Sequence, residues 1–197
     1  MNSKSNLPRR RAMRLRDYDY SQPGAYFVTI RVRHRKCLFG TIIGGKMRLN
    51  EIGQIVVECW NRIPQHFPSV ELGESVIMPN HFHGIISWSI TEARASHPPE
   101  NINTRRGEVP SSVDTNPVRR GEVPSPALGK IVAYFKYQST KHINQHHNTP
   151  RTRIWQRNYY DHVIRDDTDL QRLRQYIQDN PMKWALDQLH PDNPSRW

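Results

Sequence analysis

Residues 70–89 have the sequence VELGESVIMPNHFHGIISWS, and this stretch decides the fold. Its two apolar halves, residues 70–79 and 81–89, each have the length and composition of a strand. Pro79-Asn80 joins them tightly, so we expect two neighbouring strands of one antiparallel sheet.

His81 and His83 lie two residues apart on the second of these strands. Side chains at that spacing point to the same face of a strand, so both imidazoles can reach one divalent ion. Ile85 should share this face of the strand, and Phe82, Gly84 and Ile86 should lie on the opposite face. Two histidines in a strand are by themselves a weak signal, because such pairs are often structural. The basic character of the chain, with 29 Lys and Arg against 18 Asp and Glu, strengthens the metal interpretation.

The stretch before residue 70 predicts a strand, a hairpin and a helix in that order. Residues 25–35 alternate in polarity as a half-buried strand does, and residues 37–50 predict a hairpin that turns at Gly44-Gly45. Apolar residues then recur at steps of three and four, which is typical of an amphipathic helix. Asn50 should cap this helix and Pro64 should end it.

Three more elements are expected after residue 126. Residues from 127 onward predict a helix, residues 154–164 a strand, and a last helix should run from Asp166 or Asp167 to about Asp179. The element order predicts an α+β sandwich with a ferredoxin-like arrangement, in which helices cover one antiparallel sheet mainly on one face.

Composition divides the chain into one domain and three other segments. We expect a basic N-terminal arm at residues 1–17, one domain made of residues 18–89 and 127–189, and a tail at residues 190–197. Residues 90–126 are rich in Pro, Ser, Thr, Asn and Arg, and contain RRGEVPS twice. Such a proline-containing repeat predicts a low-complexity linker that is dispensable for folding.

The charge of the chain indicates a polyanionic partner. There are 29 Lys and Arg against 18 Asp and Glu, a formal net charge of +11. No apolar run approaches the roughly 18 residues of a membrane span. Cys37 and Cys59 form no disulfide framework, and we expect reduced thiols in a cytoplasmic, nucleoid-associated protein. Residues that we expect to contact DNA are Arg9, Arg10, Arg11, Arg14 and Arg16 in the arm, and Lys130, Tyr134, Tyr137 and Lys141 on one side of the second helix.

Tyr176 and Asn180 are four residues apart on the last helix and therefore share a face. A tyrosine hydroxyl can attack a phosphodiester and become covalently attached to DNA, and an asparagine carbonyl oxygen can bind a hard metal ion. A half-buried aromatic residue and a helix-terminal Asn are the structural alternatives. Tyr159 and Tyr160 are rival nucleophiles, and His162 is a further candidate for the neighbourhood of the site.

Three separate blocks carry a family resemblance. IMPNHFHGII (77–86), IWQRNYYDHVIRDDTDL (154–170) and QYIQDNPMKW (175–184) resemble the REP-associated tyrosine transposases. These enzymes are relatives of the single-strand insertion-sequence transposases, which have an HUH motif and one catalytic tyrosine. The resemblance extends over residues 14–89 and 127–186.

The resemblance implies a ferredoxin-like domain and a specific set of roles. His81 and His83 would bind Mg²⁺ or Mn²⁺, Tyr176 would be the nucleophile, and Asn180 would complete or support the metal site. The implied activity is metal-dependent cleavage and joining of single-stranded or hairpin DNA from repetitive palindromic elements, through a 5′-phosphotyrosine, by a monomer or homodimer. Two alternatives remain open: a domesticated protein that only binds hairpin DNA, and a metal-dependent hydrolase that uses water.

Overall fold

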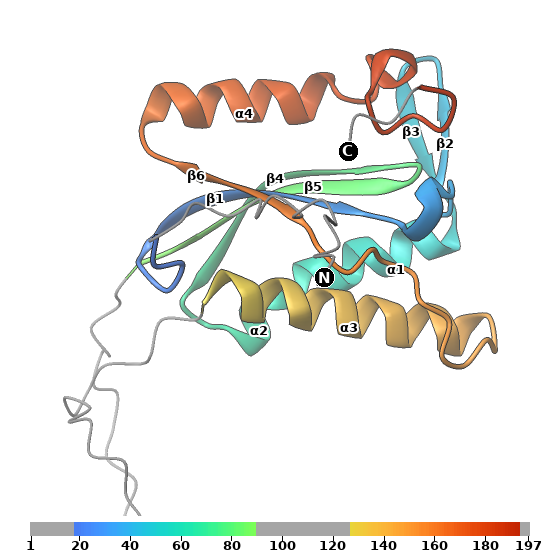
Figure 1. Ribbon diagram of the computed structural model, residues 1–197, viewed down its shortest axis with the longest axis horizontal. Coiled ribbons are helices and arrows are strands. Elements are labelled where there is room, and N and C mark those ends of the chain that lie inside the picture. Colours follow the sequence, from blue (N-terminus) through green and yellow to red (C-terminus); the bar gives the residue numbers. More distant parts are fainter. Residues whose placement is uncertain (1–17, 90–126, 194–197) are drawn as a thin grey trace, which may run out of the picture.

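The computed structural model describes residues 18–89 and 127–193, which form one antiparallel sheet with helices on both faces (Figure 1). The strand order is β4-β5-β1-β6, and each neighbouring pair is antiparallel. The strands are β1 (Gly24–Arg31), β4 (Val70–Met78), β5 (His81–Trp88) and β6 (Tyr160–Ile164).

Three of the four α-helices lie on one face of the sheet, as the sequence predicts. They are α1 (Glu51–Asn61), α2 (Ile63–His66) and α3 (Leu128–His146). The fourth, α4 (Asp167–Asp179), lies alone on the opposite face (Figure 1). The α+β class is confirmed. The helices were expected mainly on one face of the sheet, and α4 is the helix that lies on the other face.

The predicted hairpin forms a small sheet of its own. Its strands are β2 (Gly40–Ile43) and β3 (Lys46–Leu49), and they pair only with each other. Gly44 and Gly45 both have positive φ, at 57° and 71°, which suits glycine in a two-residue hairpin turn. The described residues also contain two short 3₁₀ turns, at Arg33–Arg35 and Trp184–Leu186.

Helix boundaries follow their capping residues. The Asn50 side chain accepts a hydrogen bond from the Gly53 amide at 2.9 Å and caps α1, as expected. The helix ends at Asn61, just before Pro64, which confirms the predicted stop. Pro64 itself lies in the first turn of the short α2, which the sequence did not predict. Proline is tolerated there because a first-turn amide needs no partner within the helix.

Two predicted strands are shorter than expected. Residues 25–35 leave the strand after Arg31, and His34 and Arg35 adopt positive φ values in a 3₁₀ turn. Of residues 154–164, only the last five form β6. Trp155 instead makes an isolated bridge and donates from its indole nitrogen to Ser139 Oγ at 2.9 Å. The Trp155 side chain packs in the core, and a buried aromatic residue outside a strand gives the same sequence pattern as one inside a strand.

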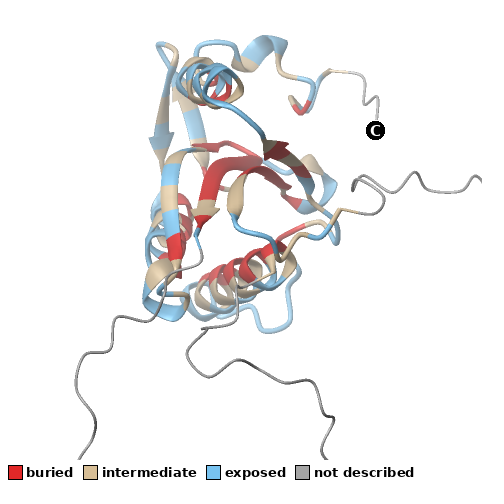
Figure 2. Ribbon diagram, turned by 90° about the vertical axis from the view of Figure 1, so that its left-hand side faces the viewer, coloured by how far each residue is buried: buried red, intermediate tan, exposed pale blue. Residues whose placement is uncertain are grey.

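Alternation along β1 and β5 divides the core into two parts. Phe82 and Ile86 pack into the larger cluster with α1–α3, whereas Ile85 packs with Leu173 and Ile177 of α4. Figure 2 shows the buried residues in the central strands and along the sheet-facing side of α3. The predicted division of the β5 side chains between the two faces is therefore confirmed. It places His81 and His83 on the side of α4.

Gly84 lets α1 approach the sheet closely. A Cβ at this position would lie 2.6 Å from a ring carbon of Trp60.

No helix in residues 18–89 or 127–193 has the length and apolar character needed to cross a membrane.

Candidate active site

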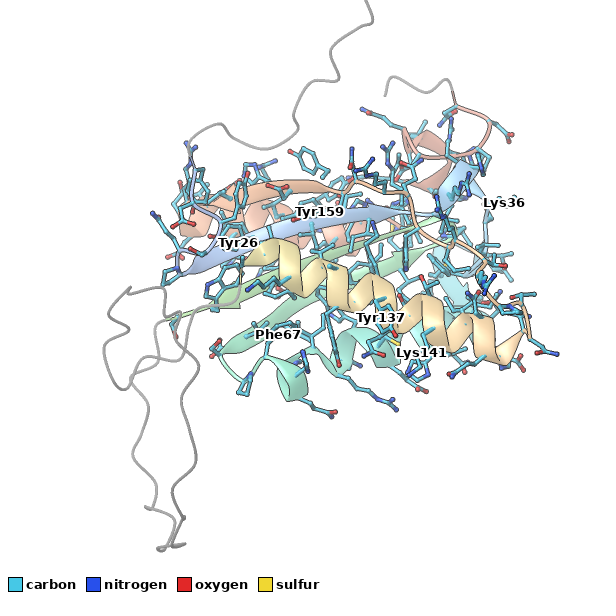
Figure 3. The ribbon with its side chains drawn as sticks, turned by 60° about the horizontal axis from the view of Figure 1, so that its bottom comes forward. Tyr26, Lys36, Phe67, Tyr137, Lys141 and Tyr159 are labelled. Carbon is cyan, nitrogen blue, oxygen red and sulfur yellow. The ribbon has the colours of Figure 1, made fainter. Side chains whose placement is uncertain are left out.

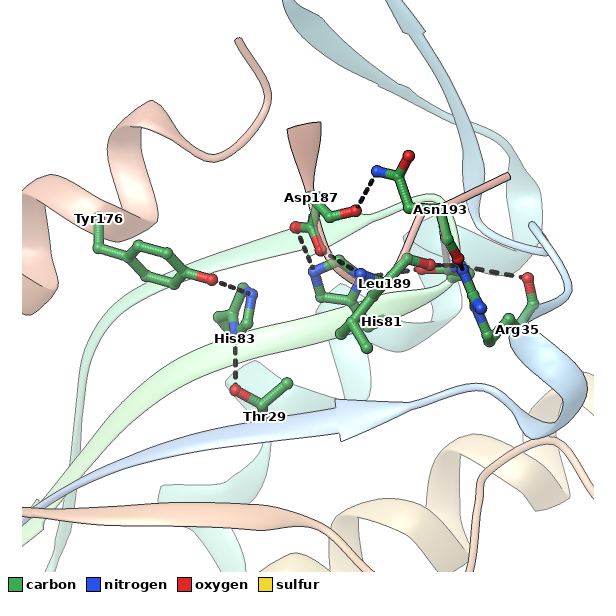
Figure 4. A network of polar contacts seen from close by, with 9 residues as sticks. Thr29, Arg35, His81, His83, Tyr176, Asp187, Leu189 and Asn193 are labelled. Carbon is green, nitrogen blue, oxygen red and sulfur yellow. Dashed lines mark hydrogen bonds and ion pairs between the residues drawn. The ribbon is translucent and has the colours of Figure 1, made fainter. Parts of the chain in front are cut away.

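The two histidines of β5 are buried and fixed by a hydrogen bond at Nδ1. His81 is 0% exposed, and its Nδ1 lies 2.8 Å from Asn80 Oδ1. His83 is 2% exposed, and its Nδ1 lies 2.8 Å from Thr29 Oγ1 (Figure 4). Because Nδ1 is engaged in both rings, the two Nε2 atoms remain for a ligand. Fixed orientation of this kind is typical of histidines that bind metal ions.

Burial also keeps these histidines neutral. Desolvation, and secondarily the nearby His83, hold the pKa of His81 well below its usual range. Burial lowers the pKa of His83 to about 3. A metal ion binds the neutral imidazole, so both rings have the required protonation state at neutral pH.

Tyr176 reaches the histidine pair from α4. The helix packs on the sheet through Leu173 and Ile177, and Tyr176 lies at the edge of this contact with 44% exposure. Its hydroxyl is 3.5 Å from His83 Nε2. Burial and the charge of Asp187 raise the pKa of Tyr176, while a contact with the Asn180 amide works against them. A partly exposed hydroxyl beside two buried histidines can meet a substrate from solvent.

Asn180 follows α4 directly and is 4% exposed. Its Oδ1 has no hydrogen-bond partner among the residues that the structure describes, and neither has Nε2 of His81. Unpartnered polar atoms are costly inside a protein, and a cation would satisfy both.

Asp187 joins the site from the segment that follows the last 3₁₀ turn. Its Oδ2 lies 3.6 Å from His81 Nε2, and the ligand atoms of His81, His83 and Asp187 all lie within 4.8 Å of one another. Burial raises the pKa of the Asp187 carboxyl, and the Leu189 amide, which donates to it, opposes the effect. The sequence did not point to Asp187, because no spacing rule links it to the histidines.

The nitrogen and oxygen atoms of these side chains are suitable ligands for a divalent metal ion. Two imidazole nitrogens from β5 and one carboxylate from the segment after the last 3₁₀ turn lie within 4.8 Å of one another. The unpartnered amide oxygen of Asn180 belongs to a residue that lines the same cavity as His83 and Asp187. Mixed nitrogen and oxygen ligands of this kind suit several divalent metals, including Mn²⁺.

A cavity of about 500 Å³ lies in front of His83 and Tyr176. Arg31, Arg172 and Lys183 line it and give it positive charge. The cavity can therefore hold an anionic group next to the tyrosine hydroxyl.

Comparisons with known proteins agree with these features. No family model matches the chain. An uncharacterised protein of Haemophilus influenzae is 39% identical over 188 residues, which cover 95% of this chain and 97% of that protein. A second protein of the same bacterium, provisionally named a REP-associated tyrosine transposase, is 24% identical over 184 residues, which cover 89% and 80%.

Among solved structures, a REP-associated tyrosine transposase bound to a REP hairpin has a similar fold. The TM-score is 0.54 at 19% identity, and the match covers 89% of this chain and 76% of that one. The chain is thus similar in sequence to a protein provisionally named a REP-associated tyrosine transposase, and similar in fold to a solved transposase of that name.

The structure brings the four predicted central residues together. His83, Tyr176 and Asn180 line one cavity, and His81 lies behind it with its ring centroid 4.6 Å from that of His83. The two histidines come from β5, Tyr176 comes from α4, and Asn180 directly follows α4. The rival Tyr159 packs against the larger core cluster, whereas Tyr160 lines the cavity. His162 also lines the cavity, as considered from the sequence, and pairs with Asp169 at 2.6 Å.

The predicted DNA-contacting side of α3 is not brought to the site. This helix lies on the face of the sheet opposite α4. Tyr137 and Lys141 are exposed there (Figure 3), and Lys130 of the same helix is exposed as well. Tyr134 stacks on His66 with ring centroids 4.2 Å apart, so this face of the ring is covered within the protein. The five arm arginines lie outside the described residues.

Proposed function

We propose that this protein is a metal-dependent endonuclease and strand transferase for single-stranded DNA, acting on hairpin DNA through a 5′-phosphotyrosine on Tyr176. The observation that carries the proposal is the Tyr176 hydroxyl, 3.5 Å from His83 Nε2 and at the wall of a positively lined cavity. Packing of the aromatic ring alone does not account for a hydroxyl that is placed beside two neutral, oriented histidines.

His81, His83, Asn180 and Asp187 would hold the metal ion in this proposal. When bound, Mg²⁺ or Mn²⁺ would neutralise charge on the scissile phosphate. The chain's own contribution is to orient the donors: Asn80 and Thr29 fix the two imidazoles. Burial of the histidines keeps them in the neutral form that can bind the ion.

Tyr176 performs the covalent step. Its oxygen forms a bond to phosphorus while the bond from phosphorus to the 3′-oxygen breaks. The tyrosine releases its proton and the 3′-oxygen takes one up, which leaves a 3′-hydroxyl and a 5′-phosphate on Tyr176. Attack by the same or another 3′-hydroxyl reverses these changes and joins strands without an external energy source.

Hairpin DNA as substrate is supported by charge and by the structural similarity. Arg31, Arg172 and Lys183 around the cavity suit the phosphates of a strand that enters it. The structurally similar REP-associated tyrosine transposase is bound to a REP hairpin. We extend this substrate class, palindromic repetitive DNA with single-stranded flanks, to the present chain.

The test is a search for the covalent adduct. Purified protein is incubated with Mn²⁺ or Mg²⁺ and a labelled hairpin with single-stranded flanks from the neighbourhood of the gene, then run on a denaturing gel. We expect an adduct with wild type and Tyr160→Phe, and none with Tyr176→Phe. Tyr160 is the matched control because it lines the same cavity. Binding without adduct or cleavage would favour a DNA-binding protein, and cleavage by Tyr176→Phe would favour a hydrolase that uses water.

A further inference from the structure

Residues 187–193 form a short segment that is fixed beside the histidine pair (Figure 4). Inside the segment, the Asn193 side-chain amide donates to the Asp187 carbonyl at 2.7 Å. The Arg35 guanidinium donates to the carbonyls of His190 and Asn193, the latter at 2.8 Å. Asn80 Nδ2 donates to the Leu189 carbonyl at 2.7 Å. The segment is therefore closed on itself and attached to the body at two places.

Asn80 connects this segment to His81. The residue is 1% exposed, and its Nδ2 donates to the carbonyls of Leu189 and Arg35, the latter at 3.1 Å. Because both amide protons are committed to carbonyls, Oδ1 must be the atom that faces His81 Nδ1. An oxygen there can only accept, so His81 carries its proton on Nδ1 and its Nε2 is an acceptor.

Asp187 then faces His81 as a second acceptor. The distance of 3.6 Å between Asp187 Oδ2 and His81 Nε2 is too long for a hydrogen bond, and neither atom has a proton to donate in this tautomer. Ligands of an ion bound at about 2.1 Å lie roughly 3 to 4 Å apart. Two acceptors at this separation, with His83 also within reach, have the arrangement of neighbouring ligands of one cation.

We propose that Asp187 is a further metal ligand delivered by residues 187–193, and that Asn80 is a positioning residue that couples docking of this segment to the orientation of His81. The inference rests on the proposed function, because it requires the histidine pair to bind a divalent ion. Metal affinity thus depends on the segment, and docking of the segment depends on the metal.

The first test measures Mn²⁺ affinity of the full-length protein without DNA, by calorimetry and by electron paramagnetic resonance of the free ion. Asp187→Asn keeps the shape of the side chain and removes its charge, and we expect affinity to fall by about tenfold or more. Asp192→Asn is the matched control, since this carboxylate lies on the same segment with 88% side-chain exposure. Equal affinity of Asp187→Asn and wild type would overturn the inference, as would tighter binding, which would mean that the segment obstructs the site.

The second test separates positioning from general stability. Arg35→Gln removes bonds to the segment but leaves the side chains of Asn80 and His81 intact. We expect weaker Mn²⁺ binding, and a double variant with Asp187→Asn that is hardly weaker than Asp187→Asn alone, because both changes remove the same ligand. Fully additive losses would contradict delivery of Asp187 by the segment.

For Asn80→Ala, we measure amide hydrogen exchange in residues 187–193 as well as Mn²⁺ affinity. In wild type, Mn²⁺ should slow exchange of the amides in residues 187–193, and in Asn80→Ala this protection should be lost and Mn²⁺ affinity should fall about 10- to 100-fold. Should Asn80→Ala not fold, Arg35→Gln provides the same exchange measurement. Protection by Mn²⁺ that persists in the folded variants would overturn the coupling.

Failure of this inference and failure of the proposed function give different results. If His81→Ala loses Mn²⁺ while Asp187→Asn retains it, the metal site stands and Asp187 is not part of it. If wild type binds no Mn²⁺, both the metal-dependent function and the inference are wrong.

Discussion

Thr29 and His83 lie directly opposite each other on β1 and β5, and Thr29 Oγ1 is 2.8 Å from His83 Nδ1. The register of the sheet thus orients a candidate metal ligand, because the hydroxyl and the imidazole belong to one cross-strand pair. A change in this pairing by one residue would place the two side chains on opposite faces of the sheet.

Replacing Thr29 with valine should therefore weaken metal binding while the fold is retained. Valine has the same shape but offers His83 no hydrogen bond, and loss of such a bond lowers metal affinity by about tenfold or more. Thr29→Ser keeps the hydroxyl and should bind Mn²⁺ as wild type does. Calorimetric titration with Mn²⁺ compares the three proteins, and equal affinities would contradict the role of Thr29.

His81→Ala and His83→Ala should each reduce adduct formation at least about 100-fold, because a bound metal ion contributes several kcal/mol to such a step. Hairpin affinity should change little, since most phosphate contacts are expected outside the histidine pair. Gel shift and denaturing gel measure the two properties separately. His146→Ala is the control, because this histidine is partly exposed and pairs with Glu51 away from the site. Normal cleavage by either site variant would rule out the metal assignment.

Tyr176→Phe should abolish the adduct with little effect on the fold. The side chain is partly exposed and its hydroxyl makes only a long contact of 3.5 Å with His83 Nε2, so its loss should change the free energy of unfolding by less than about 1 kcal/mol. Urea denaturation tests the stability, and peptide mapping of the wild-type adduct tests the assignment. An adduct that maps to Tyr160 would overturn it.

Gly84→Ala should destabilise the protein by about 1–3 kcal/mol, because overpacking a tight core forces its neighbours to move. The added Cβ would lie 2.6 Å from Trp60 and 2.8 Å from Phe82, both in the larger core. Urea denaturation measures the difference directly. A stability equal to that of wild type would show that α1 can move away from the sheet at little cost.

The two thiols should differ in reactivity. Burial raises the pKa of Cys59 to about 11, whereas Cys37 is exposed and its pKa is raised mainly by partial burial. Because the thiolate is the reactive form, Ellman's reagent at pH 8 should label Cys37 first and Cys59 only after unfolding. The rate for Cys37 should keep rising as the pH increases beyond 8. Cys37→Ser should remove the fast phase, and a fast phase that persists would contradict the burial of Cys59.

Local rules made much of this fold predictable from the sequence. Asn50 and Asp166 both cap helices through their side chains, as expected of these residue types. The alternation of 81–86 and the four-residue step from Tyr176 to Asn180 placed the correct side chains on shared faces. Each of these inferences depends on a few neighbouring residues and on regular geometry.

Long-range packing explains what the sequence did not reveal. Asp187 lies beside the histidines on a segment whose carbonyls accept hydrogen bonds from Asn80 and Arg35, and no local pattern records such contacts. Tyr134 was expected to offer its ring to bases, yet His66 from α2 stacks on it. The solitary position of α4 likewise depends on which face of the sheet the chain crosses after β6.

That solitary position has a consequence for motion. The described contacts of α4 with the sheet include a small apolar cluster around Leu173 and Ile177 and the contact of Tyr176 with His83. Two ion pairs add to them, Arg174 with Glu74 at 2.9 Å and Asp169 with His162 at 2.6 Å. The larger core beneath the other face contains none of its residues. A helix that packs outside the main core can undock at a lower free energy than global unfolding. Undocking would withdraw Tyr176 and Asn180 together and leave His81 and His83 on an intact sheet, so a DNA strand held by the tyrosine could travel with its helix.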